Sequence, residues 1–140
     1  MSDALQAALA GQYAAIYAYG RAGGRLLNDQ ARALARSDEH RVDRDQLREW
    51  LVADGQQPQP PAPAYQLPGP VRTPAQAREL LATVELRLIP VLTELVADQL
   101  DQPRRRRWAI RQIRRAALAG QSWGATGQAF PWPDGLTPPA

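Results

Sequence analysis

The sequence contains no cysteine, no lysine and only one histidine, His40. The absence of cysteine excludes disulfide scaffolds, thiol catalysis, iron–sulfur clusters and zinc sites with thiolate ligands. A single histidine excludes metal sites built on several imidazoles and any mechanism that needs two of them. All 17 basic residues are arginine, and the formal net charge of +3 is too small to indicate a nucleic-acid-binding protein by itself.

Long hydrophobic runs are also missing from the sequence. No stretch of roughly 18 consecutive apolar residues occurs, so we expect no membrane span and no membrane partner. The first residues, MSDALQAALAG, lack the basic and apolar regions of a secretory signal, which predicts a cytoplasmic location. Val, Ile and Thr together occupy only 15 positions, against 25 alanines, and this composition favours helices over strands.

Hydrophobic periodicity predicts one domain, spanning residues 1–140, with four helices. We expect these helices at about residues 3–25, 29–54, 74–100 and 103–124. Thr73 and Gln76 provide a capping box for the third helix, and Pro74 suits its first position. Pro90 lies inside an apolar period that resumes at once, so it should kink this helix rather than end it.

Residues 55–73 contain six prolines, which remove hydrogen-bond donors and favour an extended chain. We interpret this segment as a crossover, with Tyr65 and Leu67 as its anchors on the bundle. In the tail, residues 125–140, we expect Phe130 and Trp132 to pack across the end of the bundle, because large aromatic side chains are costly to leave in water.

The connection lengths indicate the architecture. Four helices with one long proline-rich crossover between the second and the third match the connectivity of ferritin-like bundles. At about 3.1 Å per residue, an extended crossover is long enough to run the length of such a bundle. The sequence therefore predicts an all-α, ferritin-like four-helix bundle.

Three longer motifs and a short one follow one another in the sequence: LQAALAGQYAAIYAYG, EHRVDRDQL, PAYQLPGPV and Phe130-Pro131. This series resembles an actinobacterial ferritin-like domain family of unknown function, over about residues 4–132. The resemblance implies the ferritin-like fold and brings no established activity. His40, Tyr65 and Glu85 match the family pattern, whereas Gln12-Tyr13 stands where members typically carry a Glu-His pair.

The second predicted helix is unusually polar on its inward side. Its inward stripe is expected to comprise Leu34, Ser37, His40, Arg44, Leu47 and Leu51. Arg36, Asp43 and Arg48 are assigned to its outer face, as solvated charges.

A di-iron site in a four-helix bundle takes a Glu from each of two helices and a Glu-x-x-His from each of the other two. Here the inward positions hold Gln12 on the first helix, Ser37 with His40 on the second, and Glu85 on the third. The fourth helix offers no ligand at residues 111–114. Two of the six ligands are present, so we expect no catalytic residue, no metal and no cofactor.

The remaining polar residues are interpreted as a cluster at the former metal position. They are Gln12, Tyr13, Ser37, His40 and Glu85. Buried polar groups must be paired, because each unpaired one costs about 1–3 kcal/mol. On one interpretation, His40 and Glu85 pair with each other or with an arginine and fix the packing. On another, they keep a residual metal or small-molecule site, which predicts a polar cavity at mid-bundle. Exposure of His40 to solvent is the third.

Seven arginines lie within residues 101–115 against Asp101 alone, which gives this stretch a local charge of +6. Guanidinium groups suit contacts with phosphates. A candidate anion-binding face therefore comprises Arg104, Arg105, Arg107, Arg111 and Arg114. Within the run, Trp108 would stack on a base of a bound nucleic acid.

The alternative is a solvated face whose arginines pair with acidic residues of the second helix, such as Asp43, Asp45 or Glu49, or with acidic residues of another subunit. Because the net charge is low, we favour this interpretation over nucleic-acid binding.

Taken together, these patterns predict a non-catalytic interaction or self-associating protein. A homodimer through the first two helices is expected, since Tyr13, Tyr17 and Tyr19 offer more apolar surface than one core stripe needs. Nucleic-acid binding through the arginines and a residual site at His40 and Glu85 are the two alternatives.

Overall fold

The computed structural model describes residues 3–125 and consists of four long α-helices. These are α1 (Asp3–Ala22), α2 (Gln30–Ala53), α3 (Pro74–Asp98) and α4 (Pro103–Ser122). Two short 3-10 turns, η1 (Gly23–Arg25) and η2 (Leu27–Asp29), connect α1 to α2. No strand occurs among the described residues, so the expected all-α four-helix architecture is confirmed.

Local signals at the helix ends explain the bounds of α3. The Thr73 hydroxyl accepts a hydrogen bond from the backbone N–H of Gln76 (3.1 Å), and the Gln76 side chain accepts one from the N–H of Thr73 (3.2 Å). This is the expected capping box, with Pro74 at the start of the helix. α3 continues through Pro90 to Asp98 instead of ending at the proline, as the apolar period predicted.

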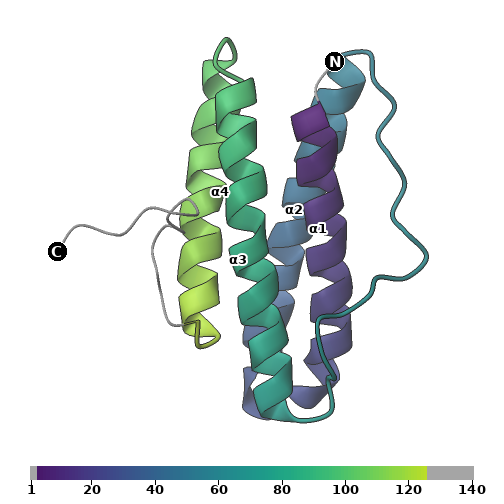
Figure 1. Cartoon of the computed structure of the whole chain (residues 1–140), viewed down its shortest axis with the longest axis vertical. Helices are drawn as coiled ribbons and strands as arrows, with labels where there is room; N and C mark the ends of the chain where they lie inside the picture. The colour runs from purple at the N-terminus through teal and green to yellow at the C-terminus, as the bar shows by residue number, and fades with distance from the viewer. Residues whose placement is uncertain (1–2, 126–140) are drawn as a thin grey trace, which may run out of the picture.

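The crossover runs outside the bundle along α1, from the end of α2 to the start of α3 (Figure 1). The Tyr13 hydroxyl donates to the carbonyl of Gln59 (3.0 Å). The ring of Tyr65 lies 5.3 Å from that of Tyr17, measured between centroids. Tyr65 and Leu67 pack against the bundle core, as expected of anchors. The expected packing of Phe130 and Trp132 lies outside the described residues.

The helices are not equally close to one another. α1 packs against α2 and α3, and α3 packs against α4. A Cβ at Gly11 would lie 2.9 Å from Leu88 Cδ2, so glycine permits the close approach of α1 to α3. α2 and α4 are bridged by large side chains, such as Trp50 and Trp108, whose rings meet edge to face at 5.1 Å.

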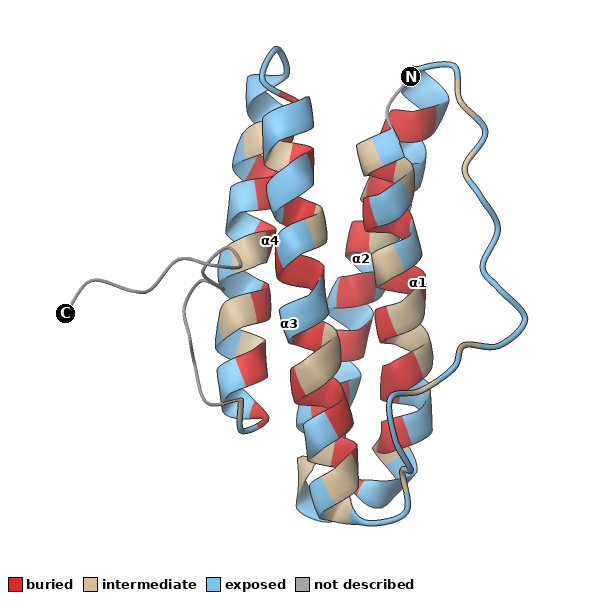
Figure 2. Cartoon of the chain, viewed as in Figure 1, coloured by how far each residue is buried: buried red, intermediate tan, exposed pale blue. Residues whose placement is uncertain are grey.

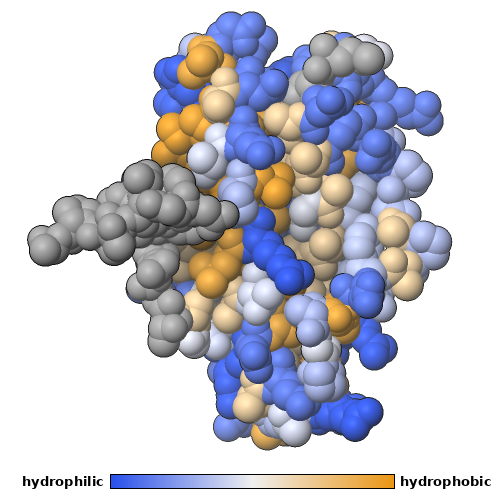
Figure 3. Space-filling model, viewed as in Figure 1, coloured by the Kyte–Doolittle hydropathy of each residue, from blue (hydrophilic) through white to orange (hydrophobic). Residues whose placement is uncertain are grey.

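Buried residues face inward on all four helices, while the crossover is largely exposed (Figure 2). The face of α1 and α3 seen in Figure 3 mixes hydrophobic and hydrophilic residues. On α2 the predicted inward stripe is found only in part, because Ser37, His40, Leu47 and Leu51 are buried but Leu34 is exposed and Arg44 is half-buried.

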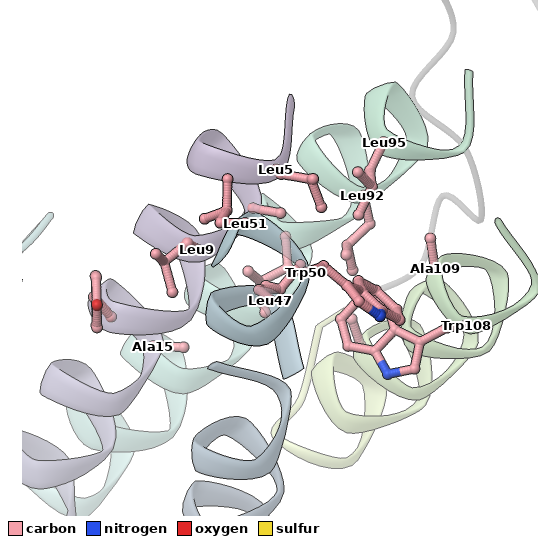
Figure 4. Close-up of a cluster of buried hydrophobic side chains, with 14 of the residues drawn as sticks. Leu5, Leu9, Ala15, Leu47, Trp50, Leu51, Leu92, Leu95, Trp108 and Ala109 are labelled. Atoms are coloured by element: carbon pink, nitrogen blue, oxygen red, sulfur yellow. The ribbon is translucent and has the colours of Figure 1, made fainter. Parts of the chain in front are cut away.

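The apolar core has two parts. One contains leucines and two tryptophans contributed by all four helices (Figure 4), and its largest members include Leu5, Leu9, Leu47, Trp50, Leu51, Leu92, Leu95 and Trp108. The other lies nearer the α1–α2 connection and includes Tyr19, Leu26, Leu80, Leu81 and Trp123. Along α2 and α3, buried polar residues occupy the stretch between the two parts. The candidate site lies in this polar layer.

Candidate functional site

Glu85, on α3, is the centre of the polar layer and is 0% exposed. Its Oε1 accepts hydrogen bonds from the Tyr19 hydroxyl (2.7 Å) and from His40 Nε2 (2.8 Å). Arg36, on α2, donates to both carboxylate oxygens, from Nε to Oε1 and from the terminal nitrogen to Oε2, each at 2.9 Å. Three side chains from two neighbouring helices therefore converge on one carboxylate.

The Arg36 guanidinium forms a bidentate pair with Glu85, the geometry in which arginine binds carboxylates best. Arg36 is only 9% exposed. Its other terminal nitrogen donates to Glu39 (2.8 Å), which lies at the surface. The positive charge thus sits inside the bundle, directly against the carboxylate.

His40 joins α1 to this centre. Its Nδ1 lies 2.7 Å from the side-chain oxygen of Gln12, and its Nε2 faces Glu85. The imidazole therefore bridges Gln12 on α1 and Glu85 on α3. His40 is 0% exposed, so the interpretation with His40 in solvent is wrong.

Tyr19 extends the network to the end of α4. Its hydroxyl donates to Glu85 and accepts a hydrogen bond from the indole N–H of Trp123 (2.8 Å). Arg32 lies over the Trp123 ring, 3.9 Å from its centroid. The network therefore connects all four helices. Gln12 and Tyr19 belong to α1, Arg36 and His40 to α2 and Glu85 to α3, and Trp123 directly follows α4.

The electrostatics of the site keep Glu85 ionised. Burial alone would raise the pKa of Glu85, but the hydrogen bonds from Arg36 and His40 and their charges lower it to about 2. Burial would lower the pKa of Arg36, and the hydrogen bonds and charge of Glu85 raise it above its ordinary value. Burial, followed by the charge of Glu85, raises the pKa of Tyr19. The network is thus a carboxylate enclosed by donors.

This arrangement leaves little capacity for chemistry at Glu85. Both of its oxygens already accept hydrogen bonds, so the carboxylate is not free to take a proton from a substrate or to bind a metal. Among residues 3–125, no three His, Asp or Glu side chains are placed to hold a metal ion. Four surface hollows of about 300–450 Å³ are present in the described chain, and none of them is lined by Gln12, His40 or Glu85.

Three of the five residues of the predicted cluster come together: Gln12, His40 and Glu85. Tyr13 does not join them. Its hydroxyl faces the crossover and bonds to Gln59 and to Arg48 (2.8 Å). Ser37 is buried, but within the described chain it makes no hydrogen bond to the network; it lines a hollow beside Tyr19 instead.

Sequence reasoning missed two side chains that donate to Glu85, those of Tyr19 and Arg36. The sequence predicted Arg36 on the outer face of α2, and the structure places it in the core, whereas Leu34, expected inside, is 61% exposed. Asp43, also assigned to the outer face, is 3% exposed. The 3–4 spacing of Arg36, His40, Asp43, Leu47 and Trp50 was the available signal, since it marks a helix face as well as an apolar stripe does.

Asp43 is a second buried charge near the network. Burial raises its pKa from the ordinary 3.8 to about 6, with the charges of Arg36 and Arg115 opposing this shift. Within the described residues its carboxylate forms no hydrogen bond. On α4, the buried side-chain oxygen of Gln112 also has no hydrogen-bond partner there. The polar layer is therefore fully paired at Glu85 and incompletely paired at these two residues.

The arginines of α4 divide into two groups. Arg105 is only 9% exposed and makes a bidentate pair with Asp54, with both distances at 2.8 Å, so it does not belong to an anion-binding face. Trp108 packs against Trp50 in the core and cannot stack on a base. Arg104, Arg107, Arg111 and Arg114 are exposed, as predicted.

The expected pairing of these arginines with α2 is found only in part. Arg105 pairs with Asp54, and Arg115 acts on Asp43 through its charge. Asp45 instead pairs with its neighbour Arg44, at 2.8 Å.

Comparison with known proteins places the chain in a family. The model of the family described as "Domain of unknown function (DUF4439)" matches residues 4–135. The chain belongs to this family. A solved structure with the same fold as this DUF4439 chain is that of a conserved hypothetical protein, rv2844, from Mycobacterium tuberculosis. The two are 26% identical with a TM-score of 0.81, and the match covers 86% of this chain and 91% of the mycobacterial one.

No curated protein matches this DUF4439 chain. Neither the family description nor the name of the mycobacterial protein assigns an activity. The function of the chain must therefore be argued from its own side chains.

Proposed function

We propose that this DUF4439 protein is a non-catalytic binding protein with a ferritin-like architecture. One observation carries the proposal: the Arg36 guanidinium lies bidentate on Glu85, in the centre of the bundle. A buried cation that saturates the central carboxylate stabilises packing and leaves no free acid, base or ligand there. Binding then takes place at the surface, and a cytoplasmic location is part of the proposal.

The ferritin-like assignment rests on connectivity and on the position of the polar layer. The crossover between α2 and α3 spans the bundle length, as in bundles with one long connection (Figure 1). Gln12, His40 and Glu85 project inward and contact one another, as the ligands of a metal site in such a bundle would. Arg36 supplies a positive charge in the place of a metal ion.

A residual metal site at His40 and Glu85 is the alternative, and the geometry opposes it. His40 Nε2 is turned toward Glu85, and its Nδ1 toward Gln12. A metal would have to displace Arg36 and compete with its fixed charge, because a dication is repelled by a guanidinium at contact distance.

Metal content tests the proposal. Protein purified without chelator is offered Fe(II), Mn(II) and Zn(II) and analysed by mass spectrometry, beside His40→Ala. We expect substoichiometric metal in both samples. Stoichiometric metal in the wild type that is lost in His40→Ala would overturn the proposal and support a redox or hydrolytic role.

Self-association is a separate expectation. Tyr13 and Tyr19 are buried and Tyr17 is partly covered by Tyr65, so these tyrosines do not supply the apolar surface on which the homodimer was based. On α2, however, Leu34 and Val42 are both more than half exposed. The homodimer through α1 and α2 therefore stays a prediction, and sedimentation at high micromolar concentration tests it, with a purely monomeric protein as the contrary result.

A further inference from the structure

The outer face of α4 carries a line of unpaired positive charges, which we call the arginine stripe. It comprises Arg104, Arg107, Arg111, Arg114 and Arg115, all of them exposed. At 3.6 residues per turn, these five positions fall within an arc of about 100°. Within residues 3–125 their side chains form no hydrogen bond or ion pair. The charge of Arg115 also acts on the buried Asp43.

This arrangement is unfavourable for the isolated protein. Like charges three or four residues apart on a helix repel one another. Arg104 and Arg107 also lie near the N-terminus of α4, where the helix dipole disfavours cations. The two buried arginines of the described chain are paired instead, Arg36 with Glu85 and Arg105 with Asp54. The stripe is thus a concentrated charge that forms no ion pair within residues 3–125, which suits an external polyanion.

We propose that the arginine stripe binds the phosphate backbone of a double-stranded nucleic acid, without reading its sequence. From Arg104 to Arg115 the helix axis advances about 16 Å, at 1.5 Å per residue. A duplex presents about one phosphate per 1.7 Å of its axis when both strands are counted, so this length spans about ten phosphates, of which about five lie on the side facing the helix. Five guanidinium groups therefore match the phosphates within reach.

Other polyanions fit this surface less well. A helix that binds an anionic membrane inserts apolar side chains from between its cations, and within the arc of the stripe Leu118 alone supplies one, near the end of α4. Base stacking needs exposed aromatic rings, and Trp108 is buried against Trp50. The contact is therefore with phosphates, which DNA and RNA duplexes share, and it carries no base information.

Fluorescence anisotropy with labelled duplexes of mixed sequence tests this proposal. Full-length protein is titrated into duplex DNA, and separately into duplex RNA of the same sequence, at 50–200 mM salt. Release of about five counterion equivalents predicts a slope of about −4.5 in log affinity against log salt, or about a 500-fold loss over this range. Vesicles with anionic lipids and polyglutamate serve as the competing polyanions.

Two matched variants identify the surface. Arg104→Glu with Arg107→Glu changes the net charge by −4 within the stripe and places glutamates near the helix start, where they favour folding. Arg21→Glu with Arg87→Glu makes the same change at exposed arginines on α1 and α3. We expect the stripe variant to bind duplex at least about 30-fold more weakly at 50 mM salt, with a slope shallower by about 2, and the control to weaken less than about threefold. Circular dichroism verifies that both variants stay helical.

Binding of either duplex with these differences supports the proposal. Equal losses in the two variants would overturn it, because the effect would then come from net charge. Absence of duplex binding at micromolar protein and 50 mM salt, or binding confined to vesicles or polyglutamate, would also overturn it. The inference rests on the proposed binding role. Metal content tests that role at the core of the bundle, whereas salt-dependent duplex binding tests the inference at α4. The proposed function and the inference can therefore fail separately.

Discussion

Arg36 in the core and the arginines on the outer face of α4 carry the same side chain in opposite environments. Arg36 is buried and bidentate on Glu85, whereas Arg107 and Arg111 are exposed and unpaired within the described chain. Arg105 is intermediate, since it is buried at the bundle edge against Asp54. Burial, rather than residue type, thus separates the arginines that are paired inside the fold from those that keep their charge in solvent.

The physical cause of the difference is desolvation. A guanidinium taken out of water needs an opposite charge and good hydrogen bonds, or it destabilises the fold. Glu85 supplies both for Arg36. A guanidinium left in water has no such need, so the stripe keeps its charge available to a partner.

The largest expected effect comes from breaking the core pair. Arg36→Met leaves Glu85 as a buried charge without its main partner, and we expect the free energy of unfolding to fall by about 3–5 kcal/mol. Urea denaturation at pH 7 measures this loss. Arg36→Met with Glu85→Gln removes the stranded charge and should recover part of the stability. A loss below about 1 kcal/mol in the single variant would contradict a central role for this pair.

Asp43 is the contrasting case, a buried carboxyl group without a hydrogen bond among residues 3–125. Its pKa in the folded protein is raised from 3.8 to about 6, so ionising it above pH 6 costs stability and protonating it at lower pH relieves the cost. We expect Asp43→Asn to stabilise the protein by about 1–3 kcal/mol at pH 7, at about 1.4 kcal/mol per pKa unit. Thermal unfolding should show this gain at pH 7 and little of it near pH 4, and a gain independent of pH would refute the assignment.

Arg105 is intermediate between the buried, paired Arg36 and the exposed arginines of the stripe, so a variant at this position tests to which group it belongs. Its pair with Asp54, whose pKa is lowered mainly by the hydrogen bond from Arg105, is partly exposed and so contributes modestly. We expect Arg105→Gln to cost about 1 kcal/mol in urea denaturation. The duplex affinity of Arg105→Gln should stay within about twofold of the wild-type value, in contrast to the affinity of Arg104→Glu with Arg107→Glu. A larger loss of binding would return Arg105 to the anion-binding face.

The smallest effect on stability is expected in the stripe itself. Arg111→Ala removes an exposed side chain from α4, so the free energy of unfolding should change by less than about 0.5 kcal/mol. Its effect should appear in binding instead, as a salt slope shallower by about 0.9. A clear loss of stability without a change in slope would show that Arg111 serves the fold.

Much of the fold could be predicted because it depends on local chemistry. Thr73, Pro74 and Gln76 cap a helix in any context, and the prolines of the crossover exclude a helix there whatever surrounds them. The meeting of Gln12, His40 and Glu85 was also predictable, since polar residues on inward stripes of three helices lie at one level of a bundle. No model of the family was needed for these steps.

It was harder to predict which side chains take part in the candidate site. Tyr13 and Ser37 lie on buried stripes, yet they face the crossover and a surface hollow. Charge usually indicates exposure, and Arg36 departs from this because a partner of opposite charge is buried with it. That partner, Glu85, lies 49 residues further along the chain, so the local sequence around Arg36 does not reveal it.

The sequence by itself determined four helices, their main boundaries and the long crossover, because proline geometry, capping and apolar periodicity act over a few residues. Only the tertiary structure decided that Arg36 turns inward to Glu85, that Arg105 pairs with Asp54 instead of joining the predicted anion-binding face, and that Trp108 is buried. These outcomes depend on how each helix is rotated against its neighbours. That rotation is set by the simultaneous burial of apolar surface and pairing of buried charges across all four helices, which no single helix encodes.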